Sequence, residues 1–169
     1  AEAAEGADVV LTCVGNDDDL ADVVLGPTGV FSTIRHGATF IDHTTVSARI
    51  ARQIAVEARD LEVHCVDAPV TGGQAGAEGG TLTVMCGGRA DAIAAASPVM
   101  EAYTKRIVHV GKAGAGQTTK MVNQIAFSGV IASLSEALRF AEAAHLDLDK
   151  VYEASSGGAS QSWQMDNRW

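Results

Sequence analysis

The fold is decided by residues 62–80, which read EVHCVDAPVTGGQAGAEGG. The first part, residues 62–70, is apolar and β-branched enough to predict a buried strand. Residues 72–80 contain five glycines, which allow positive φ angles and let a ligand approach the main-chain N–H groups. Two interpretations stay open: an anion-binding turn, to which Thr71 adds a hydroxyl, or a plain glycine-rich hairpin leading to the next strand.

Strand-like and helix-like runs alternate on both sides of this stretch. We expect strands at residues 9–14, 39–42, 62–70, 81–86 and 106–110, and helices at residues 18–25, 47–59, 90–102 and 148–155. The alternation predicts an α/β fold with a mainly parallel sheet. The strand at 81–86 is expected to depart from parallel, because the connection before it is too short for a crossover helix.

A long helix is predicted for residues 115–146, which contain no proline. Lys120, Asn123 and Gln124 stand at positions i, i+3 and i+4 of this helix, so they share one face. Burying such polar groups without partners costs roughly 1–3 kcal/mol each. The polar cluster is therefore either solvated or lines a site.

Two motifs, in this order and spacing, resemble those of a known family. Residues 67–73 (DAPVTGG) and 114–124 (GAGQTTKMVNQ) are similar to the substrate-binding and catalytic-lysine signatures of the β-hydroxyacid dehydrogenases, which include 3-hydroxyisobutyrate dehydrogenase and tartronate semialdehyde reductase and, more distantly, 6-phosphogluconate dehydrogenase. The resemblance runs through nearly the whole chain. It implies an NAD(P)-dependent oxidoreductase that interconverts a small β-hydroxyacid and its semialdehyde by hydride transfer.

The resemblance also implies a role for individual residues near the substrate. Lys120 would be the general acid and base, acting on a small carboxylate substrate. The residues implied to bind that substrate are Thr71, Gly72, Gly73, Asn123 and Gln124. Many relatives have serine in place of Thr71, so the hydroxyl is kept while the added methyl narrows the pocket.

The cofactor implied by the resemblance is NAD or NADP. The residues implied to contact it are Val14, Gly15, Asp19 and Thr45, with Gly15 where relatives often have proline. The acidic run 17–19 would suit either a cation or the start of a helix, and we expect it to cap the helix. The histidines lack the i, i+4 spacing of a metal-binding helix, so we expect no metal site.

A dinucleotide-binding domain normally opens with a strand, a G-x-G-x-x-G turn and a helix. This sequence contains no such turn. We therefore expect an internal piece of a longer enzyme. Residues 1–112 would be the C-terminal part of a truncated Rossmann-type domain whose first βαβ units are missing. Residues 113–169 would hold a long inter-domain helix and the start of an all-α domain.

Composition excludes some partners. A length of 169 residues with 47% hydrophobic content allows one sizeable core, and a net charge of −9 argues against nucleic acid and anionic membrane surfaces. We expect no apolar run of transmembrane length. Cys13, Cys65 and Cys86 lie in apolar runs, which predicts buried, reduced thiols and a cytoplasmic protein. The apolar residues spread around the long helix favour a homo-oligomer.

Two functions remain open at this level. The first is the β-hydroxyacid dehydrogenase activity with Lys120 as acid and base. The second is a non-catalytic nucleotide-binding or interaction module, which the missing G-x-G-x-x-G segment would produce. The presence of Lys120 favours the first.

Overall fold

The computed structural model describes residues 1–169 and divides into two compact units, Ala1–Met121 and Val122–Trp169. The first unit is an α/β layer around a sheet. The second contains α6 (Leu148–Ser155) and α7 (Trp163–Arg168). Helix α5 (Ala115–Ala143) begins in the first unit and continues into the second.

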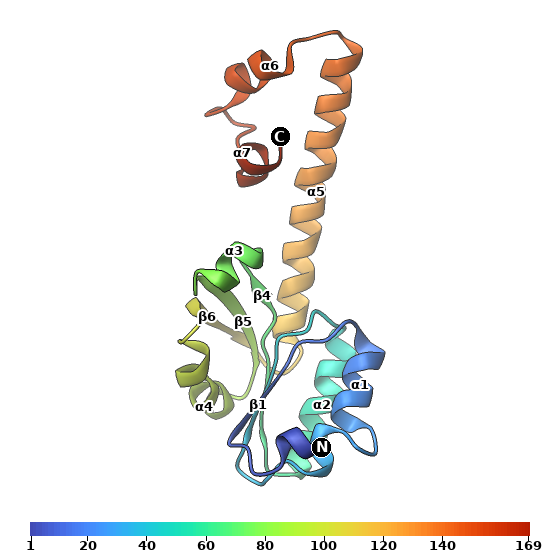
Figure 1. Ribbon diagram of the computed structural model, residues 1–169, viewed down its shortest axis with the longest axis vertical. Helices are drawn as coiled ribbons and strands as arrows, with labels where there is room; N and C mark the ends of the chain where they lie inside the picture. The colour runs from blue at the N-terminus through green and yellow to red at the C-terminus, as the bar shows by residue number, and fades with distance from the viewer. The chain divides into compact units, whose positions relative to one another are not determined.

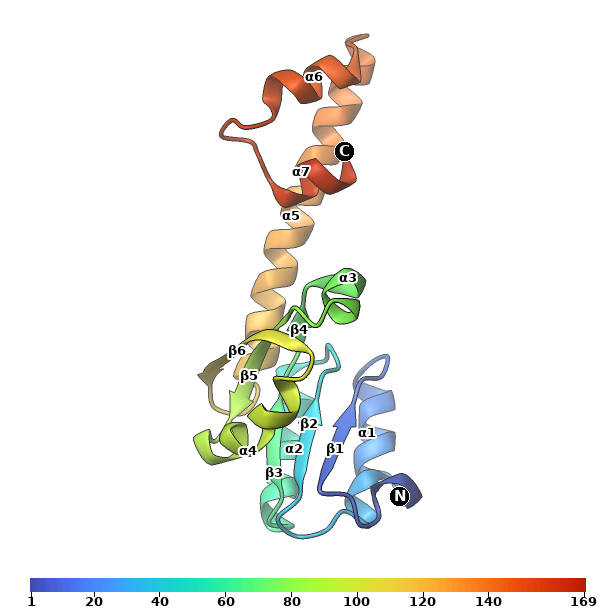
Figure 2. The ribbon, with the colours of Figure 1, turned by 60° about the vertical axis from the view of Figure 1, so that its left-hand side comes forward.

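The sheet of the first unit has six strands. They are β1 (Val9–Thr12), β2 (Thr39–Asp42), β3 (His64–Asp67), β4 (Val70–Thr71), β5 (Leu82–Gly88) and β6 (Thr104–Gly111). Strands β1, β2 and β3 are parallel neighbours, whereas β5 runs antiparallel to β3 and β4, and β6 lies parallel to β5 (Figure 2). The strand expected at residues 81–86 corresponds to β5, and its predicted departure from parallel is confirmed.

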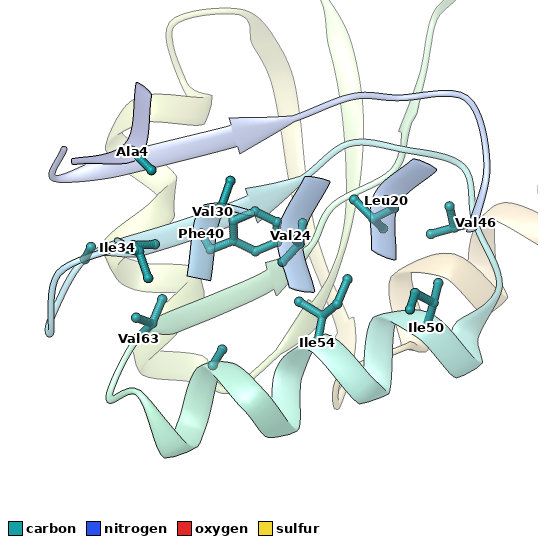
Figure 3. Close-up of a cluster of buried hydrophobic side chains, with 12 residues drawn as sticks. Ala4, Leu20, Val24, Val30, Ile34, Phe40, Val46, Ile50, Ile54 and Val63 are labelled. Atoms are coloured by element: carbon teal, nitrogen blue, oxygen red, sulfur yellow. The ribbon is translucent and has the colours of Figure 1, made fainter. Parts of the chain in front are cut away.

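Helices cover both faces of the sheet. Helices α1 (Asp17–Leu25) and α2 (Ala48–Asp60) lie on one face, and α4 (Ala90–Met100) lies on the other (Figure 1). Neighbouring side chains of β2 point to opposite faces. Phe40 therefore packs among Leu20, Val24 and Ile54 beneath α1 and α2 (Figure 3), whereas Ile41 belongs to the core under α4.

The predicted strand at 62–70 is divided in the structure into β3 and β4. Pro69 stands in the break and has no N–H to donate, but its carbonyl still accepts a hydrogen bond of 3.0 Å from Met85 N. The glycine-rich stretch that follows contains a short helix, α3 (Gly73–Glu78), where only a turn or hairpin was expected. Two 3-10 turns, Glu2–Ala4 and Val30–Ser32, complete the unit.

The acidic run lies in the first turn of α1, as expected, but the cap is made by another residue. Asn16 Oδ1 accepts hydrogen bonds of 2.9 Å from the main-chain N–H groups of Asp18 and Asp19. The Asp17 carboxylate instead accepts from Ser47 N (2.8 Å) and from the Ser47 hydroxyl, and these hydrogen bonds lower the pKa of Asp17. Asp17 thus ties the start of α1 to the start of α2.

Two expectations from composition need correction. Helix α5 is long and apolar enough to cross a membrane by length and composition alone, a criterion that core helices of soluble proteins also meet. Cys13 is exposed because it follows the end of β1, whereas Cys86 is buried, and burial raises the pKa of the Cys86 thiol to about 12.

Candidate active site

Lys120 lies against the glycine-rich turn. Its Nζ donates a hydrogen bond of 2.8 Å to the carbonyl oxygen of Val70, the residue immediately before Thr71. The side chain is partly buried, and burial lowers the pKa of its ammonium group. The structure therefore brings the two sequence motifs together through a lysine that gives up its proton more readily than an exposed one.

A buried carboxylate holds the helix that carries Lys120. Asp67, at the end of β3, accepts hydrogen bonds from Gly114 N (2.8 Å) and Gln117 N (3.0 Å) at the start of α5. Burial raises the pKa of Asp67, and the hydrogen bonds from Gly114 and Gln117 oppose that rise. The negative charge also suits the positive end of the helix dipole.

Gln117 fixes the same turn of α5 to the loop after β2. Its side chain is fully buried, donates to Thr44 O (2.6 Å) and accepts from Val46 N (3.1 Å). Thr45 stands between those two partners and is itself exposed. Thr45, which is predicted to contact the cofactor, is thereby held in place relative to α5, the helix that carries Lys120.

Close packing at the start of α5 requires glycine at position 116. A Cβ atom there would lie 2.4 Å from Met85 O and 2.6 Å from Asp67 O, both main-chain atoms. The first turn of the helix therefore sits directly on the main chain of β3 and β5.

The predicted cofactor residues gather at the C-terminal ends of β1 and β2. Val14 N donates to Thr44 Oγ1 (3.0 Å), which joins the loop after β1 to the loop that holds Thr45. Below them, Asp42 Oδ1 accepts from Thr12 Oγ1 (2.9 Å), while its Oδ2 is buried without a hydrogen bond. Burial raises the pKa of Asp42.

Gly15 and Asp19 are exposed beside these loops. Asp19 Oδ2 accepts a hydrogen bond of 2.9 Å from Asn16 Nδ2. A Cβ at Gly15 would lie 2.6 Å from the same carboxylate oxygen, so a larger residue at position 15 would displace Asp19.

The residues predicted to hold the substrate carboxylate lie at the end of β4, which is Thr71, and directly after it. Thr71 pairs with Thr83 across the sheet, and Gly72 and Gly73 have φ angles of 129° and 62°, which favour glycine. Both glycines are exposed. Their main-chain conformation fits the anion-binding interpretation of the turn as well as the connection to α3.

Asn123 and Gln124 belong to the second unit, where Asn123 Nδ2 donates to Gln124 Oε1 (3.1 Å). His43, a further polar residue at the end of β2, contacts Ala68 O (2.6 Å) and the Tyr103 hydroxyl (2.8 Å) through its two ring nitrogens. Both nitrogens of His43 are thus used within the fold.

Sequence reasoning missed the parts played by Asp67, Gln117 and Asp42. Asp67 stands inside the first motif and Gln117 inside the second, so their positions were a usable signal. The hydrogen-bond partners of Asp67 and Gln117 lie 47 to 73 residues away along the chain. Local sequence patterns do not reveal contacts between residues so far apart in sequence.

Replacing Asp67 by alanine should lower the free energy of unfolding by about 2 kcal/mol or more. The main-chain N–H groups of Gly114 and Gln117 would lose their acceptor, and each buried unsatisfied group costs roughly 1–3 kcal/mol. Urea unfolding of the purified chain measures the loss. Asp91→Ala, which removes an exposed carboxylate paired with Arg89, should have a much smaller effect on stability, because solvent screens that pair. Equal effects of the two variants would contradict the anchoring role of Asp67.

The fold and these side chains define a Rossmann-type α/β protein whose sheet continues into a long helix. Residues 1–111 match the NAD-binding domain of 6-phosphogluconate dehydrogenase, and residues 114–169 match the family described as NAD-binding of NADP-dependent 3-hydroxyisobutyrate dehydrogenase. The chain belongs to the β-hydroxyacid dehydrogenase family.

Individual relatives agree with this assignment. An uncharacterized oxidoreductase of Shewanella frigidimarina is 53% identical over 99% of this chain and 58% of its own length. An NAD-dependent L-serine dehydrogenase of Pseudomonas aeruginosa is 34% identical over 99% of this chain and 57% of its own length. The chain spans little more than half the length of these curated relatives.

Solved structures show the same fold. The 3-hydroxyisobutyrate dehydrogenase of Salmonella typhimurium superimposes with a TM-score of 0.87 at 31% identity, covering 99% of this chain and 58% of that one. The Mycobacterium tuberculosis 3-hydroxyisobutyrate dehydrogenase, solved with L-serine, gives a TM-score of 0.85 at 32% identity and covers 96% of this chain and 55% of that one.

Proposed function

We propose that this chain carries the substrate-binding and proton-transfer part of an NAD(P)-dependent oxidoreductase of the 3-hydroxyisobutyrate dehydrogenase type. The reaction interconverts a small β-hydroxyacid and its semialdehyde. The observation that carries the proposal is the hydrogen bond of 2.8 Å between Lys120 Nζ and Val70 O, which holds a partly buried lysine next to the glycine-rich turn.

Lys120 has the properties of an acid and base for this reaction. In the oxidative direction its neutral amine takes the hydroxyl proton while hydride leaves the same carbon, and in the reductive direction its ammonium group protonates the carbonyl oxygen. Burial lowers the pKa of Lys120, which enlarges the fraction of neutral amine near physiological pH. Bound NAD(P) supplies the hydride acceptor or donor.

The glycine-rich turn would orient the substrate. Main-chain N–H groups of Gly72 and Gly73 and the Thr71 hydroxyl are donors suited to a carboxylate. Holding the carboxylate there presents the hydroxyl-bearing carbon to the cofactor and its hydroxyl group to Lys120, rather than merely binding the molecule. Asn123 or Gln124 would hydrogen-bond the reacting oxygen.

The chemistry of the residues at the ends of β1 and β2 fits the nicotinamide half of a dinucleotide. Ligands of α/β sheets bind beyond the carboxyl ends of parallel strands, where Gly15 and Thr45 are exposed. Gly15 offers main-chain groups that no side chain of its own covers, Thr45 offers an uncharged hydroxyl, and Asp19 adds a negative charge. This set suits a nicotinamide ring, which is cationic in NAD(P)⁺ and neutral in NAD(P)H, and its ribose, and disfavours a pyrophosphate.

The proposal is tested by following NADH and NADPH oxidation by the complete enzyme with small semialdehydes, and NAD(P)⁺ reduction with 3-hydroxyisobutyrate and L-serine. We expect saturable turnover with at least one such carboxylate and none with the matching alcohol or aldehyde that lacks a carboxylate. Cofactor binding without turnover on any of them would instead support a non-catalytic nucleotide-binding module.

Thr71→Ala should raise KM for the carboxylate substrate roughly tenfold to a hundredfold, with a much smaller change in kcat. The reason is that a hydrogen bond to a charged group, worth about 1.5–3 kcal/mol, would be lost in the ground state and the transition state alike. Thr71→Ser keeps the hydroxyl and should restore KM. Thr83→Ala, which changes the cross-strand neighbour of Thr71, is the matched control. A fall in kcat with KM unchanged would contradict this role.

The wider organisation belongs to the same proposal. Residues 1–112 would contribute to the dinucleotide-binding domain and residues 113–169 would begin a helical domain. Val122, Ile125 and Phe140 of α5 are 63%, 74% and 75% exposed, an apolar surface that a second copy of the chain would cover. The reduced thiols Cys65 and Cys86 favour a cytoplasmic location.

A further inference from the structure

A recess of about 690 Å³ lies in the first unit, between α2 and the C-terminal ends of β5 and β6. We refer to it as the α2–β6 groove. Its apolar lining includes Ala55, Val56, Val63 and Ala113. The groove reaches the N-terminal end of β3 through Val63 and Cys65, whereas the residues proposed for the cofactor follow the C-terminal ends of β1 and β2. None of the proposed substrate or cofactor residues lines it.

The rim of the groove is positively charged in an otherwise acidic molecule. Arg52, Arg59, Arg89 and Lys112 line it, and no aspartate or glutamate does. These are four of the twelve lysines and arginines in a chain whose net charge is −9. Such a local excess of one charge over low-dielectric walls attracts ligands of the opposite sign.

Two of the four cations already have partners, and two do not. Arg59 pairs with Asp60 (3.2 Å) and Arg89 with Asp91 (2.7 Å), in side chains that are more than half exposed. Solvent screens exposed pairs of this kind, so they compete weakly with a bound anion. Arg52 and Lys112 form no ion pair, and they stand on α2 and on the segment after β6.

The wall formed by β5 and β6 is held in place from within. His109 Nε2 contacts Gly88 O (3.1 Å) and Gly111 O (3.0 Å), which ties the ends of the two strands together. The recess is therefore formed before any ligand arrives. Its volume lies within the range of roughly 300–1,000 Å³ that small-molecule sites occupy.

The geometry points to the α2–β6 groove as a binding site, separate from the proposed active site, for a small amphipathic anion. The apolar body of the ligand would lie on Ala55, Val56 and Val63, and its phosphate, sulfonate or carboxylate would be held by Arg52 and Lys112. An uncharged ligand would leave those cations without a partner. A small inorganic anion would leave the apolar lining uncovered.

The test is a titration of the ¹⁵N-labelled chain with 1-naphthyl phosphate, followed by amide NMR and by calorimetry. We expect saturable shifts centred on the amides of Gly88, Gly111 and Ala113. Neutral 1-naphthol and inorganic phosphate should each bind at least tenfold more weakly. Equal affinity for either of these two compounds would overturn the proposal, as would shifts that do not saturate or that centre on α5.

Matched variants separate the groove from the rest of the surface. The double variant Arg52→Ala/Lys112→Ala should weaken 1-naphthyl phosphate at least tenfold, and Val56→Asp should abolish binding. Val56 is 47% exposed, so this change should leave the fold intact, which the NMR spectrum checks. Lys105→Ala on β6 and Val23→Asp on α1, both at exposed positions outside the groove, should bind normally.

Unchanged affinity in the groove variants would overturn the proposal. So would a change in oligomeric state on Val56→Asp, measured by sedimentation, because the groove would then be an interface between copies of the chain.

Discussion

Lys120→Met should lower kcat of the complete enzyme by about 10²–10⁴-fold and leave the affinity for NAD(P)H nearly unchanged. General acid–base catalysis contributes a factor of this size, and methionine keeps the length of the side chain without a proton to transfer. The hydrogen bond from Lys120 Nζ to Val70 O is lost as well, but it is a side-chain contact and not one of the hydrogen bonds that join the strands. Steady-state kinetics and cofactor titration measure the two quantities.

The control is Lys105→Met, which removes an exposed lysine of β6 and should leave kcat within about twofold of the original value. The pH profile adds an independent check. Activity in the oxidative direction should rise with pH through the pKa of Lys120, which burial lowers, and the residual activity of Lys120→Met should lack that limb. Turnover unchanged by Lys120→Met would remove the assignment of Lys120 as acid and base.

Lys120→Met should lower kcat without lowering the stability of the chain. The pKa of Lys120 is lower in the folded than in the unfolded chain, so folding carries a cost below the folded pKa that disappears as pH rises past the unfolded value near 10.5. Removing the amine should therefore leave the unfolding midpoint at neutral pH equal or higher. A catalytic loss that came merely from unfolding would lower it.

Gly116→Ala should destabilise the chain by about 1–3 kcal/mol. The added methyl would lie within 2.6 Å of two carbonyl oxygens of β3 and β5, and main-chain atoms cannot rotate away as a side chain can. Relieving the contact requires the first turn of α5 to move off the sheet. That movement stretches the hydrogen bonds from Gly114 N and Gln117 N to Asp67.

Gly129→Ala provides a control in the same helix. A Cβ at Gly129 meets no atom within 4 Å, so alanine should raise stability by about 0.5–1 kcal/mol through its better helix propensity. Urea unfolding of both variants, followed by circular dichroism, separates the two mechanisms. A similar small effect of the two substitutions would show that α5 does not rest directly on the sheet.

The regular part of the fold was predictable because local patterns determine it. Strand β2 coincides with the predicted residues 39–42, and α6 coincides with the predicted 148–155. Helix α5 begins at the predicted Ala115 and ends at Ala143, a few residues before the predicted end at 146. The early end falls just before His145, whose φ of 55° no helical residue adopts.

Helix α3 was not predicted because its sequence argues against it. Two of the six residues in the stretch GQAGAE are glycine, and glycine disfavours a helix interior. In the structure Gly76 faces Leu82, where a Cβ would lie 3.1 Å from the leucine side chain, and Thr81 N donates to Gly76 O. Tertiary packing thus outweighs local preference.

The candidate site was predictable only in part. The two motifs identify Lys120 and the glycine-rich turn, and the structure adds the hydrogen bond that brings them together. The supporting residues Asp67 and Gln117 act through contacts with segments far away in sequence. Hydrophobic period and residue type contain no information about such pairings.

The hydrogen bonds of Asp67 affect how the chain folds during synthesis and where a stable domain can be excised from it. A chain that stopped after β6 would contain every strand of the sheet, yet its buried carboxylate at the end of β3 would have no N–H groups to bind. During synthesis, the sheet cannot reach its final stability until Gln117 has left the ribosome and the first turn of α5 has formed. An excised sheet domain should therefore extend beyond Lys120. The first turns of α5 belong structurally to the sheet domain and are its last element.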